Sequence, residues 1–156
     1  MATILRRSPG RSWRLERGAG RPILLATLDV PFDPDAARIA VDAAVESGCP
    51  LVVANVVELP PLAMSVRMGY DQLDLPANEE ALRAPADLAR SLGVAVERVR
   101  VRSMRPVAAL LELVAERTPA LVVFGPDESR LGSRRYRRAA RRLRDTAPCL
   151  VWIPGA

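Results

Sequence analysis

Residues 121–154 read LVVFGPDESRLGSRRYRRAARRLRDTAPCLVWIP, and this stretch decides the fold class. Its apolar start predicts a strand at Leu121–Phe124, which is followed by a turn at Gly125. An arginine-rich segment from about Arg134 to Thr146 predicts a helix, and a second apolar run predicts a strand at Leu150–Ile153. Two strands joined by a crossover helix are typical of a parallel sheet, in which ligands bind at the turn after a strand.

The same alternation of strands and helices extends back to residue 22. We expect buried strands at Ile23–Asp29 and Leu51–Val57, and an edge strand at Val94–Arg102, where apolar and charged residues alternate. The apolar spacing predicts helices at 34–47, 77–92 and 106–117, the second of them weakened by Pro85. This order predicts a doubly wound α/β domain over residues 22–156, with a parallel sheet and helices on both faces.

Charge is distributed unevenly along the chain. Residues 1–21 hold six arginines and one glutamate, a net +5, and we expect them to form a disordered basic tail. Residues 22–129 hold nine arginines and sixteen acidic residues, a net −7, whereas residues 130–156 hold eight arginines and one aspartate, a net +7. Such asymmetry suits an anionic partner or the association of unlike surfaces, and it equally suits a solvated face.

Missing residue types restrict the chemistry. The chain has no histidine, which excludes histidine-based acid–base catalysis and most zinc sites, and no lysine, which excludes a P-loop or a Schiff base. Two cysteines, Cys49 and Cys149, make no disulfide framework, so we expect buried thiols in a reducing cytoplasm. Because no apolar run approaches the roughly 18 residues that span a bilayer, and no secretory signal is visible, we expect a cytoplasmic protein without membrane contact.

Three segments in this order resemble the universal stress protein family. They are Ala26–Asp29, Asn55–Glu58, and Val122–Gly125 followed by Thr146–Val151, and the similarity runs from about Pro22 to Pro154. The resemblance implies a Rossmann-like, adenine-nucleotide alpha-hydrolase-like fold with a five-stranded parallel sheet of order 3-2-1-4-5. It also implies a homodimer, paired through the last strand at Leu150, Val151, Trp152 and Ile153. Some family members hold ATP between the first and fourth strands.

The resemblance assigns roles to three positions of the predicted site. Asp29 matches the acidic position that contacts the ribose or base, where a carboxylate is a strong acceptor for hydroxyl groups. Val56 matches the position whose backbone meets the adenine edge. Gly125 matches the first glycine of the phosphate loop, which in the family reads Gly-x-x-Gly, nine residues, then Gly-Ser or Gly-Thr.

The rest of that loop departs from the family pattern. The second glycine falls on Asp127 or Glu128, and the closing pair falls on Arg137 and Arg138, counted back from Ala147–Cys149. Gly132-Ser133 comes too early and fits a turn before the helix, with Ser133 as the N-cap. Arg137 and Arg138 are therefore expected either to clamp an anion through forked hydrogen bonds or to block the pocket.

The arginine-rich helix has two faces. Tyr136, Ala139, Ala140 and Leu143 recur at helical spacing and predict the buried stripe, and arginines fill the remaining arc. This arc suits a solvated or dimer-facing surface, an acidic protein, or nucleic acid. Tyr136 is the one aromatic residue nearby, so a stacking platform for single strands is not predicted. The candidate contacts for an acidic macromolecule are Arg134, Arg137, Arg138, Arg141 and Arg142.

From these observations we expect a non-enzymatic stress-response or regulatory domain without a metal or a required cofactor. Its ligand is anionic or a nucleotide, such as ATP or AMP, and ATP is not expected to bind by the usual loop. One alternative is a nucleotide-free dimer that binds an acidic protein or nucleic acid through the arginine-rich helix. Another is a weak nucleotide hydrolase that uses Asp29, although a lone carboxylate is thin support for catalysis.

Overall fold

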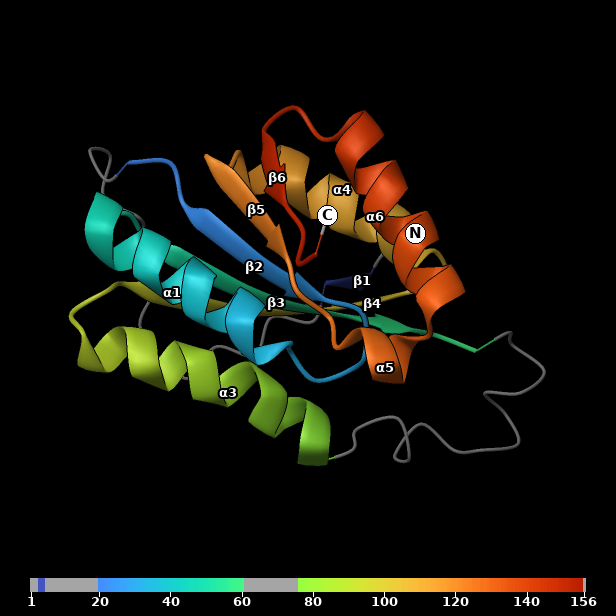
Figure 1. The fold of residues 1–156 in the computed structure, drawn as a ribbon, viewed down its shortest axis with the longest axis horizontal. Helices are drawn as coiled ribbons and strands as arrows, with labels where there is room; N and C mark the ends of the chain where they lie inside the picture. The colour runs from blue at the N-terminus through green and yellow to red at the C-terminus, as the bar shows by residue number, and fades with distance from the viewer. Residues whose placement is uncertain (1–2, 5–19, 61–75, 156) are drawn as a thin grey trace.

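The computed structural model describes residues 3–4, 20–60 and 76–155, and every structural statement below refers to these ranges. Figure 1 shows one twisted sheet between two layers of helices. The strands are β1 (Thr3–Ile4), β2 (Ile23–Thr27), β3 (Leu51–Glu58), β4 (Val96–Ser103), β5 (Leu121–Phe124) and β6 (Leu150–Trp152). The helices are α1 (Pro34–Ser47), α3 (Pro76–Ser91), α4 (Pro106–Arg117), α5 (Glu128–Leu131) and α6 (Ser133–Thr146).

The sheet has the order β1-β4-β3-β2-β5-β6. The five strands from β4 to β6 pair in parallel, which confirms the expected doubly wound sheet of order 3-2-1-4-5. β1 adds a short antiparallel strand outside β4, with Thr3 opposite Arg102 and Ile4 opposite Val101. We expected Val94–Arg102 to form the edge of the sheet. This is wrong at Val101 and Arg102, because Thr3 and Ile4 of the N-terminal tail pair with them.

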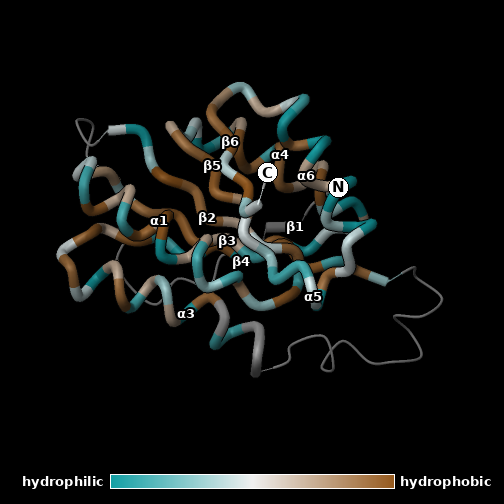
Figure 2. The backbone as a smooth tube through the Cα atoms, in the orientation of Figure 1, coloured by the Kyte–Doolittle hydropathy of each residue, from teal (hydrophilic) through white to brown (hydrophobic). Residues whose placement is uncertain are grey.

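Side chains that alternate along the strands pack into two separate hydrophobic clusters, one on each face of the sheet. Leu24 and Ala26 of β2 join the cluster under α4 and α6, whereas Ile23 and Leu25 join the cluster under α1 and α3. Both faces of β2 are consequently buried, as the unbroken apolar run of this strand predicts. Figure 2 shows the central strands β2 and β5 in the hydrophobic colour, with hydrophilic stretches on the outer helices.

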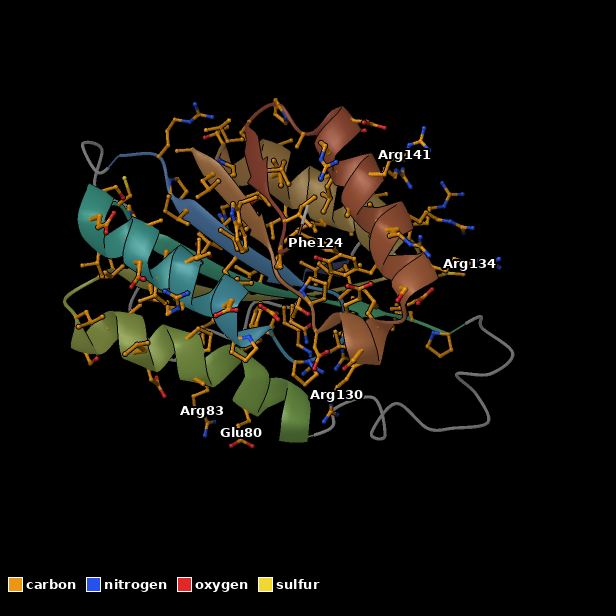
Figure 3. All side chains as sticks on the ribbon, in the orientation of Figure 1. Glu80, Arg83, Phe124, Arg130, Arg134 and Arg141 are labelled. Carbon is orange, nitrogen blue, oxygen red and sulfur yellow. The ribbon has the colours of Figure 1, made fainter. Side chains whose placement is uncertain are left out.

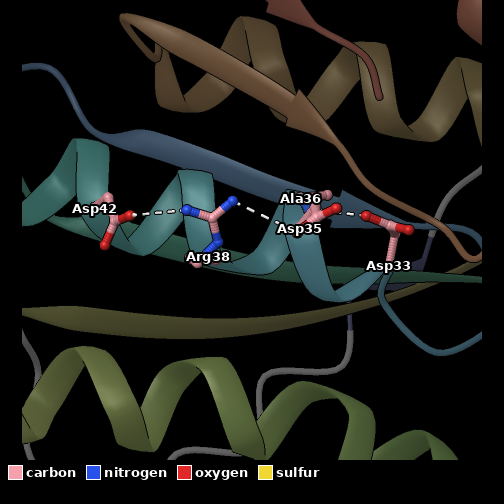
Figure 4. Close-up of polar contacts among 5 residues, drawn as sticks. All are labelled: Asp33, Asp35, Ala36, Arg38 and Asp42. Atoms are coloured by element: carbon pink, nitrogen blue, oxygen red, sulfur yellow. Dashed lines mark hydrogen bonds and ion pairs between the residues drawn. The ribbon is translucent and has the colours of Figure 1, made fainter. Parts of the chain in front are cut away.

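The helix boundaries follow local capping chemistry. Asp33 caps α1 by accepting a hydrogen bond from the N–H of Ala36 at 2.9 Å, and Gly48 ends the helix with φ +67°. Figure 4 shows this cap next to the ion pairs that Arg38 makes with Asp35 and Asp42, at 3.5 and 3.9 Å. α3 continues through Pro85, which is buried. No helix in the described ranges is both long enough and apolar enough to cross a bilayer.

Candidate functional site

The candidate site lies where the strand order reverses, at the carboxyl ends of β2 and its two neighbours, β3 and β5. We call this place the mouth of the sheet, or the switch point. β2 pairs with β3 as far as Thr27 opposite Asn55, and with β5 as far as Ala26 opposite Phe124. Val56 and Gly125 therefore come directly after the last paired residues, and Asp29 lies two residues beyond Thr27. In doubly wound sheets this is the position at which ligands bind.

The turn after β2 is fixed by buried polar groups. Asp29 has a left-handed backbone, with φ +56°, and its N–H donates to Oδ1 of Asn55 at 3.0 Å. The Asn55 side chain is only 1% exposed, and the buried hydroxyl of Thr27 donates to the carbonyl of Val30 at 2.7 Å. These two hydrogen bonds hold a backbone conformation that non-glycine residues seldom adopt, so Asp29 is positioned rigidly at the mouth of the sheet.

The loops after β2 and β5 are joined along their backbones. The N–H of Gly125 donates to the carbonyl of Ala26 at 2.9 Å, and the carbonyl of Gly125 accepts from the N–H of Asp33 at 2.8 Å. The N–H of Asp127 donates to the carbonyl of Pro31 at 2.9 Å. A Cβ atom on Gly125 would lie 2.5 Å from Cβ of Ala36, so the loop after β5 rests directly on the start of α1.

The segment after Gly125 winds into the single-turn helix α5. Asp127 caps this turn, because its Oδ1 accepts from the N–H and the hydroxyl of Ser129 at 2.9 and 2.6 Å. The hydrogen bond from the Ser129 hydroxyl lowers the pKa of the Asp127 carboxyl, which therefore stays ionised at neutral pH. The N–H groups of Arg130, Leu131 and Gly132 donate to the carbonyls of Asp127 and Glu128.

All but one of the N–H donors in residues 125–132 are therefore occupied within the protein, and the exception is the N–H of Glu128. Six of them, from Gly125, Asp127, Ser129, Arg130, Leu131 and Gly132, make hydrogen bonds to other groups of the chain. Pro126 has no N–H, and Glu128 adds a negative charge to that of Asp127. Because a phosphate loop works through unoccupied N–H groups that point at the anion, this segment is a poor cradle for a polyphosphate.

Arg137 and Arg138 lie on the exposed face of α6. The Nε–H of Arg137 donates to the carbonyl of Ser133 at 3.3 Å, within the helix itself. Both arginines line a shallow groove of about 600 Å³ along the outside of α6, which contains none of Asp29, Val56 and Gly125. Arg135 of α6 does reach a strand end, because it forms an ion pair with Glu58 at the end of β3.

A second groove, of about 540 Å³, lies between α6 and the C-terminal segment. Tyr136 and Ile153 contribute apolar surface to it, and Arg137, Arg141 and Arg144 contribute charge. The Tyr136 hydroxyl donates to the carbonyl of Pro154 at 3.4 Å, and burial raises its pKa. Within the described ranges no group of three histidine, cysteine, aspartate or glutamate side chains is placed to hold a metal ion.

Residues 20–153 match the model of the universal stress protein family. The chain belongs to this family. Universal stress protein UspA from Lactobacillus plantarum is 18% identical, with a TM-score of 0.62, and the alignment covers 85% of this chain and 97% of that one. The universal stress protein from Archaeoglobus fulgidus in complex with dAMP is 23% identical, with a TM-score of 0.59 and coverage of 85% and 95%.

A universal stress protein in complex with cAMP is 21% identical, with a TM-score of 0.58 and coverage of 85% of this chain and 95% of that one. A comparison with curated protein sequences found no match. The fold of this chain is therefore that of the universal stress proteins, over nearly the full length of each structural relative.

This universal stress protein brings together three of the five residues that the sequence singled out. Asp29, Val56 and Gly125 meet at the switch point, whereas Arg137 and Arg138 lie on a different surface. The reason is the register of α6: Tyr136, Ala139, Ala140 and Leu143 form its buried stripe, which turns the two arginines outward. The sequence predicted this stripe, but the alignment to the family loop overrode it for Arg137 and Arg138.

Two features of the site were not expected. Asn55 supports Asp29, and its signal was a single polar residue inside the apolar run of β3. The turn α5 was missed, although Asp127 followed by Ser129 is a recognisable cap.

The expectation that Ser133 caps α6 is wrong by one residue: Gly132, with φ +91°, is the N-cap and Ser133 begins the helix. The helix starts earlier because only glycine adopts this backbone conformation readily.

Proposed function

We propose that this universal stress protein is a non-enzymatic regulatory domain that recognises an adenine nucleotide by its base and ribose. Asp29 and the backbone of Val56 make these contacts at the mouth of the sheet, and only the first phosphate is held. Two structural relatives, whose complexes contain dAMP and cAMP, bind nucleotides with a single phosphate group, which supports this choice of ligand.

We place the protein in the cytoplasm, because Cys49 and Cys149 are both free thiols. Cell fractionation tests this placement.

The six occupied N–H groups within residues 125–132 are the observation that carries the proposal. They bond to Ala26, to Pro31 and to one another, so a β- or γ-phosphate finds carboxylates rather than donors. A hydrolytic function is disfavoured on the same ground, because phosphoryl transfer needs charge stabilisation of the transferred group. The chain also offers no histidine or lysine to provide acid–base chemistry.

In a protein with a phosphate loop, affinity rises from adenosine to AMP to ATP because each phosphate adds contacts. We do not expect this rise here. Calorimetry with magnesium present should give AMP and adenosine affinities within about tenfold of each other, since one charge-assisted hydrogen bond contributes roughly 1.5 kcal/mol. ATP should bind no tighter than AMP, and no phosphate should be released over hours. ATP binding more than tenfold tighter than AMP, or steady phosphate release, would contradict the proposal.

A variant without the two carboxylates distinguishes repulsion of the phosphates by Asp127 and Glu128 from the lack of N–H donors that could bind the phosphates. Asp127→Asn together with Glu128→Gln removes two negative charges, while the amide introduced at position 127 keeps an oxygen for the N–H of Ser129. If phosphates pass this segment, the variant should bind ATP about tenfold tighter and adenosine unchanged. Equal gains for ATP and adenosine would show that these carboxylates do not face the ligand. Glu46→Gln with Glu80→Gln, which removes two negative charges from α1 and α3 on the other sheet face, is the control for altered net charge.

We also propose that the protein is a homodimer that pairs through β6. Among the described residues this strand ends the sheet and pairs only with β5, and Leu150 is 75% exposed. An unpaired strand edge with exposed apolar side chains is a template for pairing with a second copy. Sedimentation should give a dimer mass for the native chain and a monomer mass for Leu150→Arg. Leu88→Arg, at another exposed leucine on α3 (51%), should remain dimeric; a native monomer would refute the pairing.

A further inference from the structure

The outer face of α6 carries a continuous field of positive charge. Seven arginines and a single aspartate, Asp145, project from this 14-residue helix. Arg135 pairs with Glu58, and Arg141 lies 3.8 Å from Asp145. The other five guanidinium groups have no carboxylate partner among the described residues: Arg134, Arg137, Arg138, Arg142 and Arg144.

These arginines form three rows along the helix. With 3.6 residues per turn, positions seven apart lie on the same side. Arg137 and Arg144 therefore lie along one flank, and Arg135 and Arg142 along the opposite flank. Arg134, Arg138 and Arg141 run between them, and Figure 3 shows Arg134 and Arg141 pointing away from the sheet. The helix is about 21 Å long, at 1.5 Å per residue.

The chemistry of this face does not suit a protein partner. The buried centre of a stable protein interface is poor in charged residues, and its strongest contacts, which include arginine as well as tyrosine and tryptophan, lie in well-packed, desolvated pockets. The groove on the outside of α6 is lined by five arginines with Asp145 and Thr146, and its lining includes no apolar or aromatic side chain. Packing so many like charges at three- and four-residue spacing also costs stability within the helix, and Asp145 offsets little of it.

A phosphate backbone needs no apolar centre. Guanidinium groups bind phosphate through forked hydrogen bonds, and the binding is sequence-independent because every nucleotide carries the same phosphate. The absence of aromatic side chains from the described outer face of α6 removes base stacking, which favours a duplex over a single strand. An α-helix with its side chains is roughly 10–12 Å across, and the major groove of B-DNA is about 12 Å wide, so the two flanking rows face the two strands.

We propose that the outer face of α6 binds the phosphate backbones that border the major groove of duplex DNA, independently of base sequence. Half of the helix circumference packs on the sheet, where Tyr136, Ala139, Ala140 and Leu143 are buried. The helix therefore enters the groove only partly, and its arginines meet phosphates rather than base edges. The net −7 of residues 22–129 repels the remainder of the duplex and confines the contact to α6.

Salt dependence gives a quantitative test with the full-length chain. Anisotropy of a labelled 20-base-pair duplex is measured between 50 and 200 mM salt, with two unrelated sequences. Five phosphates contacted predict a slope of about −4.5 in log K against log salt, which is roughly a 500-fold loss of affinity over that range. Both sequences should bind alike. No binding at 50 mM salt, or a preference above tenfold for one sequence, would overturn the proposal.

Matched variants locate the contact. Arg137→Gln, Arg142→Gln and Arg144→Gln together, from the two flanking rows, should reduce the slope to about −1.8, because three contacts of roughly 0.9 each are lost. Arg38→Gln, Arg83→Gln and Arg90→Gln remove the same charge from α1 and α3 and should leave the slope unchanged. Glutamine is a good helix former, so circular dichroism should show both variants folded. Equal losses in the two variants would reduce the effect to net charge and overturn the assignment to α6.

Three further measurements address the basic tail, the groove geometry and the class of partner. Arg6→Gln, Arg7→Gln and Arg11→Gln in the basic tail should preserve the difference between the two helix variants; if this variant alone abolishes binding, the proposal is wrong. Duplex RNA should bind more weakly, because its major groove is deep and narrow. Equal binding of duplex RNA would refute the groove geometry. Polyglutamate that binds while duplex DNA does not would identify an acidic protein surface instead.

Discussion

Phe124→Ala is expected to lower the free energy of unfolding by about 4 kcal/mol, because it removes a large side chain from the core and leaves a cavity. Phe124 is 0% exposed, and its ring centroid lies 5.6 Å from that of Tyr136. It is also the last residue of β5, directly before the turn that rests on α1. The loss should appear in a urea titration as a lower midpoint with an unchanged slope.

Phe124→Leu is the matched control for this substitution. It keeps most of the buried volume and loses the contact between the two rings, so a cost of about 1.5 kcal/mol is expected. The difference between the two variants measures the cavity. If Phe124→Ala costs less than Phe124→Leu, the β5–α6 contact is not part of the core. Tyr136 begins the buried stripe of α6, so weaker docking of that helix should accompany the loss.

Gly125→Ala is expected to cost about 3 kcal/mol, at the upper end of the cost of overpacking a well-packed site. The added methyl group would lie 2.5 Å from Cβ of Ala36 and 3.4 Å from Cδ1 of Leu25. Both neighbours are fully buried, so the loop after β5 has to move away from α1. Thermal unfolding should report the loss as a fall in Tm of roughly 10 °C.

A double-mutant cycle isolates the steric cause. Ala36→Gly alone should cost about 1 kcal/mol, from the lower helix propensity of glycine. In the double variant the methyl group of residue 125 occupies the space that Ala36 vacated, so its cost should be at least about 1 kcal/mol below the sum of the single variants. Simple additivity would contradict the close approach, and would place the strain of Gly125→Ala elsewhere in the loop.

The arrangement of the sheet was predictable because its three central strands, β2, β3 and β5, are buried on both faces. The runs at Ile23–Thr27, Leu51–Val57 and Leu121–Phe124 are almost entirely apolar, and the helices between them have strong start signals at Pro34 and Pro106. Short elements were not predictable in the same way. α5 has four residues and β1 has two, so neither contains enough of the hydrophobic pattern to be recognised.

The candidate site was predictable in position and only partly in composition. The resemblance to the universal stress proteins named Asp29, Val56 and Gly125, and the sequence placed all three at the carboxyl ends of parallel strands, which meet at one edge of the sheet. The predicted stripe of α6 already turned Arg137 and Arg138 outward, and the alignment to the family loop was what placed them at the site. The support of Asp29 by Asn55 joins residues 26 positions apart, a pairing that no local pattern contains.

The outer face of α6 is built from arginine alone among the basic residues, and that choice removes the usual switches. A guanidinium group does not lose its proton in the physiological pH range, and without lysine the surface cannot be neutralised by acetylation. Methylation of arginine keeps the charge. The positive charge on this helix is therefore permanent. Binding of another molecule or a change in ionic strength is what remains to weaken its attraction for anions.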